Sequence, residues 1–203
     1  SKYYEGYLIM FHLEATMQGD NRYNDQLQNA ISQDFISKEI GFYTETKKNL
    51  ETLDYESLSY KDKTVYDVLD FTLKDKIEKY AYHPELMPFN QFEGLPLDFP
   101  LLGSGDGNQP FKTTKDYDNF LKRIDAFAVW MNTAEKNFRD GMKQNVMLPK
   151  KLVVKMIPQM RGEEIISENF DKNIFYGPIK KIPASFSAAD KQKYTVLYQN
   201  AIK

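Results

Sequence analysis

A single spacing pattern in the middle of the chain constrains its fold more than any other feature. Seven apolar residues follow one another at alternating intervals of three and four: Tyr117, Phe120, Ile124, Phe127, Met131, Ala134 and Phe138. These intervals place all seven on one side of a helix, with the 3.5-residue period of helices that cross at about 20°. Thr113 or Thr114 is suited to cap the start, and Gly141 is expected to end the helix. The sequence therefore predicts a long helix that packs nearly parallel or antiparallel to its neighbours.

Five other stretches have apolar residues at helical spacing, at about residues 3–17, 34–53, 59–82, 149–158 and 188–203. In the second, Gly41 is expected to make a close packing contact, because glycine inside a helix costs about 1 kcal/mol relative to alanine. In the third, an apolar stripe recurs every fourth residue and is expected to be buried: Val65, Leu69, Leu73 and Ile77. We predict an all-α fold, an irregular bundle of five to six helices that forms a single domain or lobe over residues 1–203.

The last helical stretch has a clear start and no stop signal. Ser187 and Asp190 are spaced as a capping box, and an apolar stripe follows: Tyr194, Leu197, Tyr198 and Ile202. The pattern runs to Lys203 without the glycine, asparagine or proline that commonly ends a helix. We therefore expect the parent protein to continue beyond Lys203, and its C-terminal part to be a packing partner of this stripe.

Residues 83–113 lack helical periodicity and contain five prolines and four glycines. We predict one long ordered loop, with an apolar first half against the helices and a solvated turn at residues 103–108. Phe89, Asn90 and Gln91 are candidates for the wall of a substrate-binding cleft, because loops on a rigid scaffold often carry binding sites. The alternative is that the two amides only satisfy hydrogen bonds within the folded chain.

The charge and hydropathy of the chain exclude two kinds of partner. A formal net charge of −2 and a pI near 5.8 offer no basic surface for nucleic acid. No apolar run approaches the roughly 20 residues that cross a bilayer. We therefore expect neither a nucleic-acid partner nor a transmembrane helix.

Two histidines and no cysteine leave little material for metal or nucleophilic chemistry. Zinc sites take several His, Cys or carboxylate ligands, and neither histidine lies in an H-E-x-x-H motif. We interpret His12 as a residue at the boundary of the core and His83 as a loop residue. Glu163, Glu164 and Glu168 are interpreted as a solvated helix face and not as an acid and base pair. No catalytic residue, metal ligand or cofactor is therefore expected within this chain.

Several short segments, in order and spread over essentially the whole chain, carry a family resemblance. They are Glu14 to Asp20 with Arg22, Tyr23 and the Leu27 segment, Pro88 to Gly94, Tyr117 to Phe138 with Gly141 and Pro149, and Phe175 to Pro178. Together they resemble a large bacterial family known as domain of unknown function 885, many of whose members are described as lipoproteins.

The resemblance implies a largely α-helical protein of the bacterial envelope, periplasmic or at the outer envelope and lipid-anchored. The family is similar to helical zinc metallopeptidases and carries an H-E-x-x-P-G-H-type motif in its C-terminal half. This chain corresponds to the N-terminal portion and does not contain that motif. No catalytic or metal residue is therefore carried over, and any zinc of the parent protein is expected beyond Lys203.

Two hypotheses for function follow. In the first, the chain is the helical N-terminal part of a metal-dependent hydrolase or peptidase and contributes one wall of its cleft without being catalytic by itself. In the second, it is a non-enzymatic envelope module that binds peptide or glycan in a groove between helices. An H-E-x-x-H-like helix downstream of Lys203 would favour the first hypothesis, and its absence the second.

Overall fold

The computed structural model describes residues 2–167 and 169–202, and within these ranges it contains helices and no β-strand. The α-helices are α1 (Lys2–Met10), α2 (His12–Met17), α3 (Gln33–Glu51), α4 (Tyr60–Glu78), α5 (Leu95–Gly103), α6 (Thr114–Lys143), α7 (Lys150–Met160), α8 (Glu163–Ile166), α9 (Gly177–Lys180) and α10 (Ala188–Ile202). Short 3₁₀ helices connect them: η1 (Asn21–Tyr23), η2 (Tyr55–Ser57), η3 (Lys79–Tyr82), η4 (Pro84–Leu86) and η5 (Ile174–Tyr176). The predicted all-α fold is confirmed. None of the described helices is long and apolar enough to cross a membrane.

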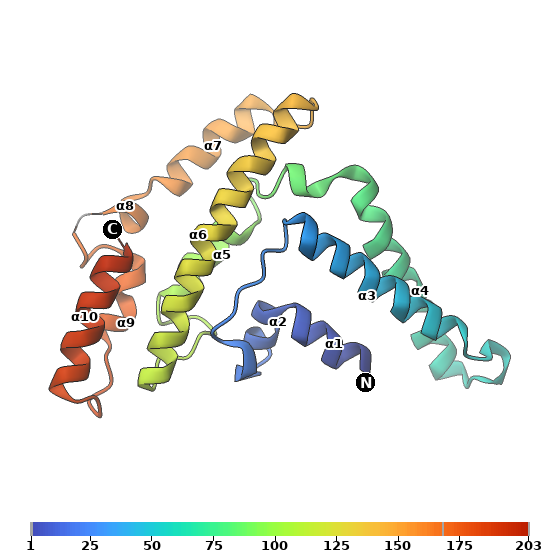
Figure 1. Ribbon diagram of the computed structural model, residues 1–203, viewed down its shortest axis with the longest axis horizontal. Coiled ribbons are helices and arrows are strands. Elements are labelled where there is room, and N and C mark those ends of the chain that lie inside the picture. Colours follow the sequence, from blue (N-terminus) through green and yellow to red (C-terminus); the bar gives the residue numbers. More distant parts are fainter. Residues whose placement is uncertain (1, 168, 203) are drawn as a thin grey trace.

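The long central helix is α6, which lies between α7 and α10 on one side and the α3–α4 hairpin on the other (Figure 1). Its predicted cap is confirmed, because the Asp116 backbone N–H donates to Thr113 Oγ1 at 3.3 Å and the Thr113 N–H donates to Asp116 Oδ2 at 2.8 Å. Gly141 does not end the helix, which continues to Lys143. Instead a Cβ at Gly141 would lie 2.5 Å from the Val146 carbonyl oxygen, so glycine is required here for close backbone approach.

One side of α6 carries the aromatic core of the protein. Tyr117 and Phe120 are buried against Tyr194 and Tyr198 of α10, and Phe99 of α5 stacks on Phe120 at a centroid distance of 5.5 Å. The tyrosine hydroxyls have partners, as buried hydroxyls require: Tyr198 donates to the Tyr117 carbonyl at 3.3 Å. Helix α6 thus covers Tyr194 and Tyr198, the inner part of the last apolar stripe. These two side chains are therefore not exposed to the residues that we expect beyond Lys203. Lys203 itself lies outside the described residues.

A second side of α6, adjacent to the aromatic one, is also buried, but it is polar. Arg123 is fully buried, and its guanidinium donates to the carbonyls of Gln26 (3.0 Å) and Tyr23 (3.1 Å), to Thr16 Oγ1 (2.7 Å) and to Gln109 Oε1. None of these acceptors is charged. Burial therefore lowers the pKa of Arg123, to about 10. This residue joins three segments that are distant in the sequence.

The same polar side of α6 holds the extended segment that leads into α3. Asn137 Nδ2 donates to the Ile31 carbonyl at 2.8 Å, and Asn29 Nδ2 donates to Thr133 Oγ1 at 2.7 Å. These contacts, together with those of Arg123, fix residues 23–31 along the helix. The predicted apolar seam therefore describes only one of the two buried sides of α6.

The α3–α4 hairpin has a smaller core of its own, formed by Tyr43, Leu50 and Leu73. Its helices begin at the serine caps Ser32 and Ser59, each of which accepts a backbone N–H at 3.2 Å. Beyond this core, the hairpin exposes large apolar side chains on the outer face of α4.

Two expectations for the hairpin were wrong. Val65 is 59% exposed, although Leu73 of the same predicted stripe is fully buried. A repeat of four drifts by about 40° per step on a helix of 3.6 residues per turn, so Val65 has rotated away from α3. Gly41 is exposed, and a Cβ built there would meet nothing within 4 Å, so no packing contact explains this glycine.

The segment predicted as one long loop contains a helix, α5. Pro96 lies in the first turn, where a missing N–H costs little, whereas Pro100 lies inside the helix and removes one backbone hydrogen bond. Phe99 stacks on Phe127 at a centroid distance of 4.3 Å, which places this short helix in the core. The expected solvated turn at residues 103–108 was also wrong in part, because Gly103 and Ser104 are buried. These contacts depend on α6, which the local sequence does not reveal.

The first predicted helix is divided in two at Phe11. The His12 backbone N–H donates to the side-chain Oε1 of Gln28 at 3.1 Å, and Phe11 has a non-helical conformation. The second half, α2, ends at Met17 as predicted, and Gly19 just after it has a positive φ of 81°.

Candidate functional site

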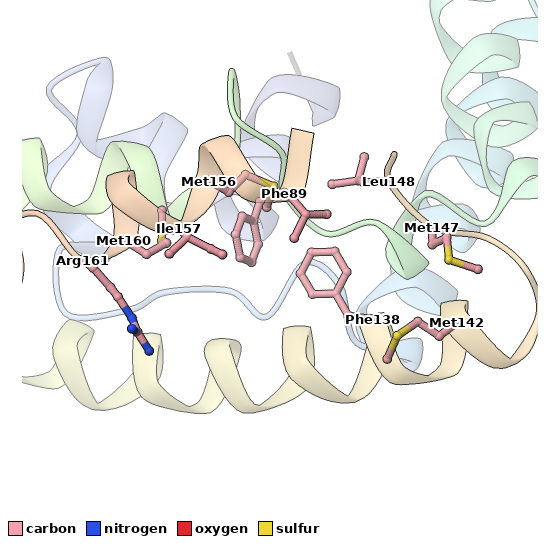
Figure 2. A pocket seen from close by; sticks show the side chains of 10 residues that line it. Phe89, Phe138, Met142, Met147, Leu148, Met156, Ile157, Met160 and Arg161 are labelled. Carbon is pink, nitrogen blue, oxygen red and sulfur yellow. The ribbon is translucent and has the colours of Figure 1, made fainter. Parts of the chain in front are cut away.

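An apolar groove lies between the C-terminal half of α6, helix α7 and the loop that carries Phe89 (Figure 2). Its volume is about 430 Å³, within the usual range for sites that bind small ligands. We call it the methionine groove, and it is lined by Phe89, Phe138, Met142, Met147, Leu148, Val153, Met156, Ile157, Met160 and Arg161. Nine of these ten side chains are apolar, so the groove favours an apolar ligand.

Phe89 and Phe138 form the middle of the groove. Phe89 packs against Phe138 edge to face at a centroid distance of 5.1 Å and against Trp130 at 6.2 Å. Trp130 is buried and stacks on Phe127. The aromatic side of α6 therefore continues into the wall of the groove, and the single tryptophan of the chain lies directly behind it.

The α7 wall comes from an amphipathic helix that follows Pro149. Met156 is buried, while Val153 and Ile157 are each about half exposed and face the groove. The helix ends at Met160, two residues beyond Pro158, the predicted end of this stretch. Because Pro158 lies near the end of α7, its missing N–H affects only the last turn.

Four methionines and one arginine give the groove its chemical character. Methionine side chains are flexible and polarisable, and they adapt to ligands of different shape. Arg161 lies at one end of the groove, opposite the end formed by Met142 and Met147 (Figure 2). Arg161 forms no ion pair with another described residue. It is therefore free to bind an anionic group such as a carboxylate.

Of the three predicted cleft residues, Phe89 alone lines the methionine groove. Asn90 Oδ1 accepts the backbone N–H groups of Phe92 (2.8 Å) and Glu93 (3.2 Å), so this amide stabilises the turn. The Gln91 carbonyl accepts a hydrogen bond from Gln159 Nε2 of α7 at 3.0 Å. The loop is thereby joined to α7, and Asn90 and Gln91 position Phe89 without contacting the groove.

A second cavity of about 480 Å³, with both polar and apolar lining residues, lies on the other side of Phe89. Two of its lining residues bind the buried Glu39, which accepts hydrogen bonds from Lys79 Nζ at 2.9 Å and from the Tyr80 hydroxyl at 2.5 Å. Burial and the Glu39 carboxylate raise the pKa of Tyr80. Glu85 also lines this cavity. Since Glu39 is satisfied by its two partners, we treat this cluster as structural.

The histidines occupy separate places. His12 stacks on Tyr23 at a centroid distance of 5.5 Å, and burial lowers its pKa. His83 is exposed and has a left-handed backbone with φ of 51°. Its Nδ1 lies 3.2 Å from Glu85 Oε1. Within residues 2–167 and 169–202, no group of three or more His, Cys, Asp or Glu side chains could hold a metal ion.

Among the described residues, the acidic side chains near α8 do not form an acid and base pair. Glu163 and Glu164 are exposed, and Glu163 pairs with Lys172. Glu168 lies outside the described residues.

The residues of this groove fall within a known family. The family model described as "Bacterial protein of unknown function (DUF885)" matches residues 13–203. The chain belongs to this family. A search of curated proteins and a search of solved structures gave no match. The match to DUF885 begins in α2 and includes every residue that lines the methionine groove.

Sequence reasoning identified Phe89 but missed most of this DUF885 groove. The signal that could have revealed it is the distribution of methionine, since four of the eight in the chain lie between residues 142 and 160. Such a concentration is typical of adaptable binding surfaces. The sequence did not indicate that Arg161 lines the groove, because its position depends on where α7 ends relative to α6.

Proposed function

We propose that this DUF885 chain binds peptides, with an apolar side chain of the peptide in the methionine groove and a peptide carboxylate at Arg161. The observation that carries this proposal is the groove itself, which is apolar over its length and has at its end a cation, Arg161, that pairs with none of the described residues. Burial of a large apolar side chain there contributes about 1.5–3 kcal/mol of binding free energy. A charge-assisted hydrogen bond between Arg161 and the peptide carboxylate fixes the orientation of the peptide in the groove.

A peptide fits this groove better than a glycan does. A glycan presents many hydroxyl groups, and each hydroxyl that enters an apolar groove without a partner costs free energy. Arg161 is the one polar side chain in the lining. The glycan alternative is therefore the weaker of the two ligand classes for this groove.

In the parent protein, we propose that the groove is a wall of a peptide-binding cleft. The resemblance to metal-dependent hydrolases motivates this role, with zinc and the catalytic residues supplied by the C-terminal part and the whole protein lipid-anchored in the envelope. The chain itself would bind and orient the substrate. Cleavage by the parent protein that is unchanged when the groove is blocked would contradict this role.

Trp130 provides a direct test of binding, because it is the only tryptophan and lies against Phe89. Titration with N-acetyl-Ala-Ala-Leu should change its fluorescence in a saturable manner, whereas N-acetyl-Ala-Ala-Ser should bind at least about tenfold more weakly. Ile157→Asn should weaken leucine-peptide binding about tenfold. Val154→Asn is the matched control, because Val154 is exposed on α7 and outside the groove. Equal effects of the two variants, or no saturable change, would contradict the proposal.

Arg161 is tested with the same reporter. The leucine peptide with a free carboxylate should bind about tenfold more tightly than its C-terminal amide, because only the acid can pair with the guanidinium. Arg161→Gln should remove this difference without abolishing binding of the amide. Equal affinities of acid and amide for the unmodified protein would exclude the carboxylate contact and leave the apolar contact standing.

A further inference from the structure

The outer face of α4 exposes an apolar stripe that α3 does not cover. Val65, Val68 and Phe71 are spaced by three and expose 59%, 61% and 72% of their surface. The packed side of α4 is formed by other residues, with Leu73 fully buried in the hairpin core. In Figure 1 the hairpin projects away from α6, α7 and α10. Exposed apolar residues at helical spacing indicate a surface that binds a partner.

The residues of this face are arranged symmetrically about Val68. Three positions to either side lie Val65 and Phe71, four positions away lie Thr64 and Thr72, and seven positions away lie Lys61 and Asp75. Offsets of three, four and seven return to the same face of a helix. The pairs match in character: apolar with apolar, threonine with threonine, and cation with anion.

The charged pair determines the orientation of a partner. Lys61 and Asp75 are both exposed, and neither forms an ion pair with any of the residues described. If a second α4 crosses at Val68 in the antiparallel direction, Lys61 of each copy lies opposite Asp75 of the other. A parallel crossing would instead place equal charges opposite one another, which is unfavourable.

We infer that the outer face of α4 binds a second copy of this chain, with the two α4 helices antiparallel about a two-fold axis at Val68. A two-fold interface requires a surface that is complementary to itself, and the sequence of this face meets that requirement. One helix face is smaller than the roughly 800 Å² per partner of standard interfaces. The dimer should therefore dissociate on dilution. This inference does not depend on the methionine groove.

Sedimentation velocity over a range of protein concentrations tests the inference. The unmodified protein should show a reversible monomer–dimer equilibrium. Phe71→Ser should abolish the dimer without loss of helical structure by circular dichroism, because Phe71 is largely exposed in the monomer. A protein that stays monomeric at the highest concentration, or a dimer that persists in Phe71→Ser, would overturn the inference.

A charge exchange tests the orientation. Lys61→Glu and Asp75→Lys should each weaken the dimer about tenfold, because each places two like-charge contacts in the interface. The double variant should restore the dimer, since the exchanged charges again face each other in the antiparallel arrangement. Lys151→Glu, an exposed change on α7, is the matched control and should leave the dimer unchanged. Failure of the double variant to recover would overturn the antiparallel arrangement.

Discussion

Helices α6 and α4 both carry apolar residues at helical spacing, yet the structure uses them in opposite ways. Helix α6 is covered on two sides, by aromatic residues of α5 and α10 on one and by the polar segment around Arg123 on the other. Helix α4 is covered on one side by α3, and its outer face remains exposed. Periodicity therefore identifies residues that share a face, whereas only the placement of neighbouring elements decides whether that face is buried.

The largest effect is expected on the polar side of α6. Arg123→Met should destabilise the protein by about 3–5 kcal/mol, because it leaves several buried acceptors without a donor. Lys122→Met, next to it, should change stability by less than about 1 kcal/mol, because its ion pair with Asp25 at 3.1 Å is exposed. Urea unfolding measures both. If the two variants unfold at the same urea concentration, the polar side of α6 is not a core.

Two phenylalanines test the aromatic side of α6 against the outer face of α4. Phe127→Ala should cost about 3 kcal/mol, because Phe127 stacks on Phe99 and Trp130. Phe71→Ala should cost less than about 0.5 kcal/mol, measured at a concentration where the protein is monomeric. Equal shifts of the urea midpoint by the two substitutions would contradict the difference in burial between Phe127 and Phe71.

Two glycines test the same difference between exposed and covered helix faces, and the expected effect on stability is smaller. Gly41→Ala in α3 should stabilise the protein by about 0.5–1 kcal/mol, because alanine is the better helix former and a Cβ meets nothing there. Gly141→Ala in α6 should destabilise it by more than that, because the Cβ would collide with the carbonyl oxygens of Val146 and Leu86. Thermal unfolding by calorimetry should show opposite signs, and shifts of the same sign would refute the assignment.

The smallest effect concerns His12, beside the polar side of α6. Burial lowers the pKa of His12 in the folded state below its unfolded value of about 6.5, so the unfolded state binds the proton more readily. The contribution of His12 to stability is therefore complete above about pH 6.5 and is lost as pH falls below it. His12→Asn should reduce the slope of stability against pH between about 5 and 7. An unchanged slope would mean that His12 is equally solvated in both states.

The parts of the fold that local sequence determines could be predicted. The caps at Thr113 and Ser187 could be identified, because each cap joins residues three apart in the chain. The seam of α6 could be predicted for the same reason. Helix α5 could not, because its two prolines oppose a helix locally and its stability depends on Phe99 in the core.

Only a part of the candidate site could be predicted. Phe89 was named as a candidate because it lies in a proline-rich loop, and loops on a rigid scaffold often carry binding sites. The groove it lines depends on the approach of α7 to α6, which involves residues such as Phe138 and Ile157 from different helices. Arg123 was missed for a related reason. An arginine off the apolar seam is usually exposed, and the acceptors that make its burial favourable, such as the carbonyls of residues 23 and 26, come from distant parts of the chain.

The central claim, that the groove between α6 and α7 binds peptide while the outer face of α4 does not, is tested most directly by hydrogen–deuterium exchange with and without N-acetyl-Ala-Ala-Leu. We predict slower exchange in α7 and around Phe89 at saturating peptide, with α4 and α10 unchanged. Protection centred on α4, or no protection in α7 when Trp130 fluorescence shows saturation, would contradict the account.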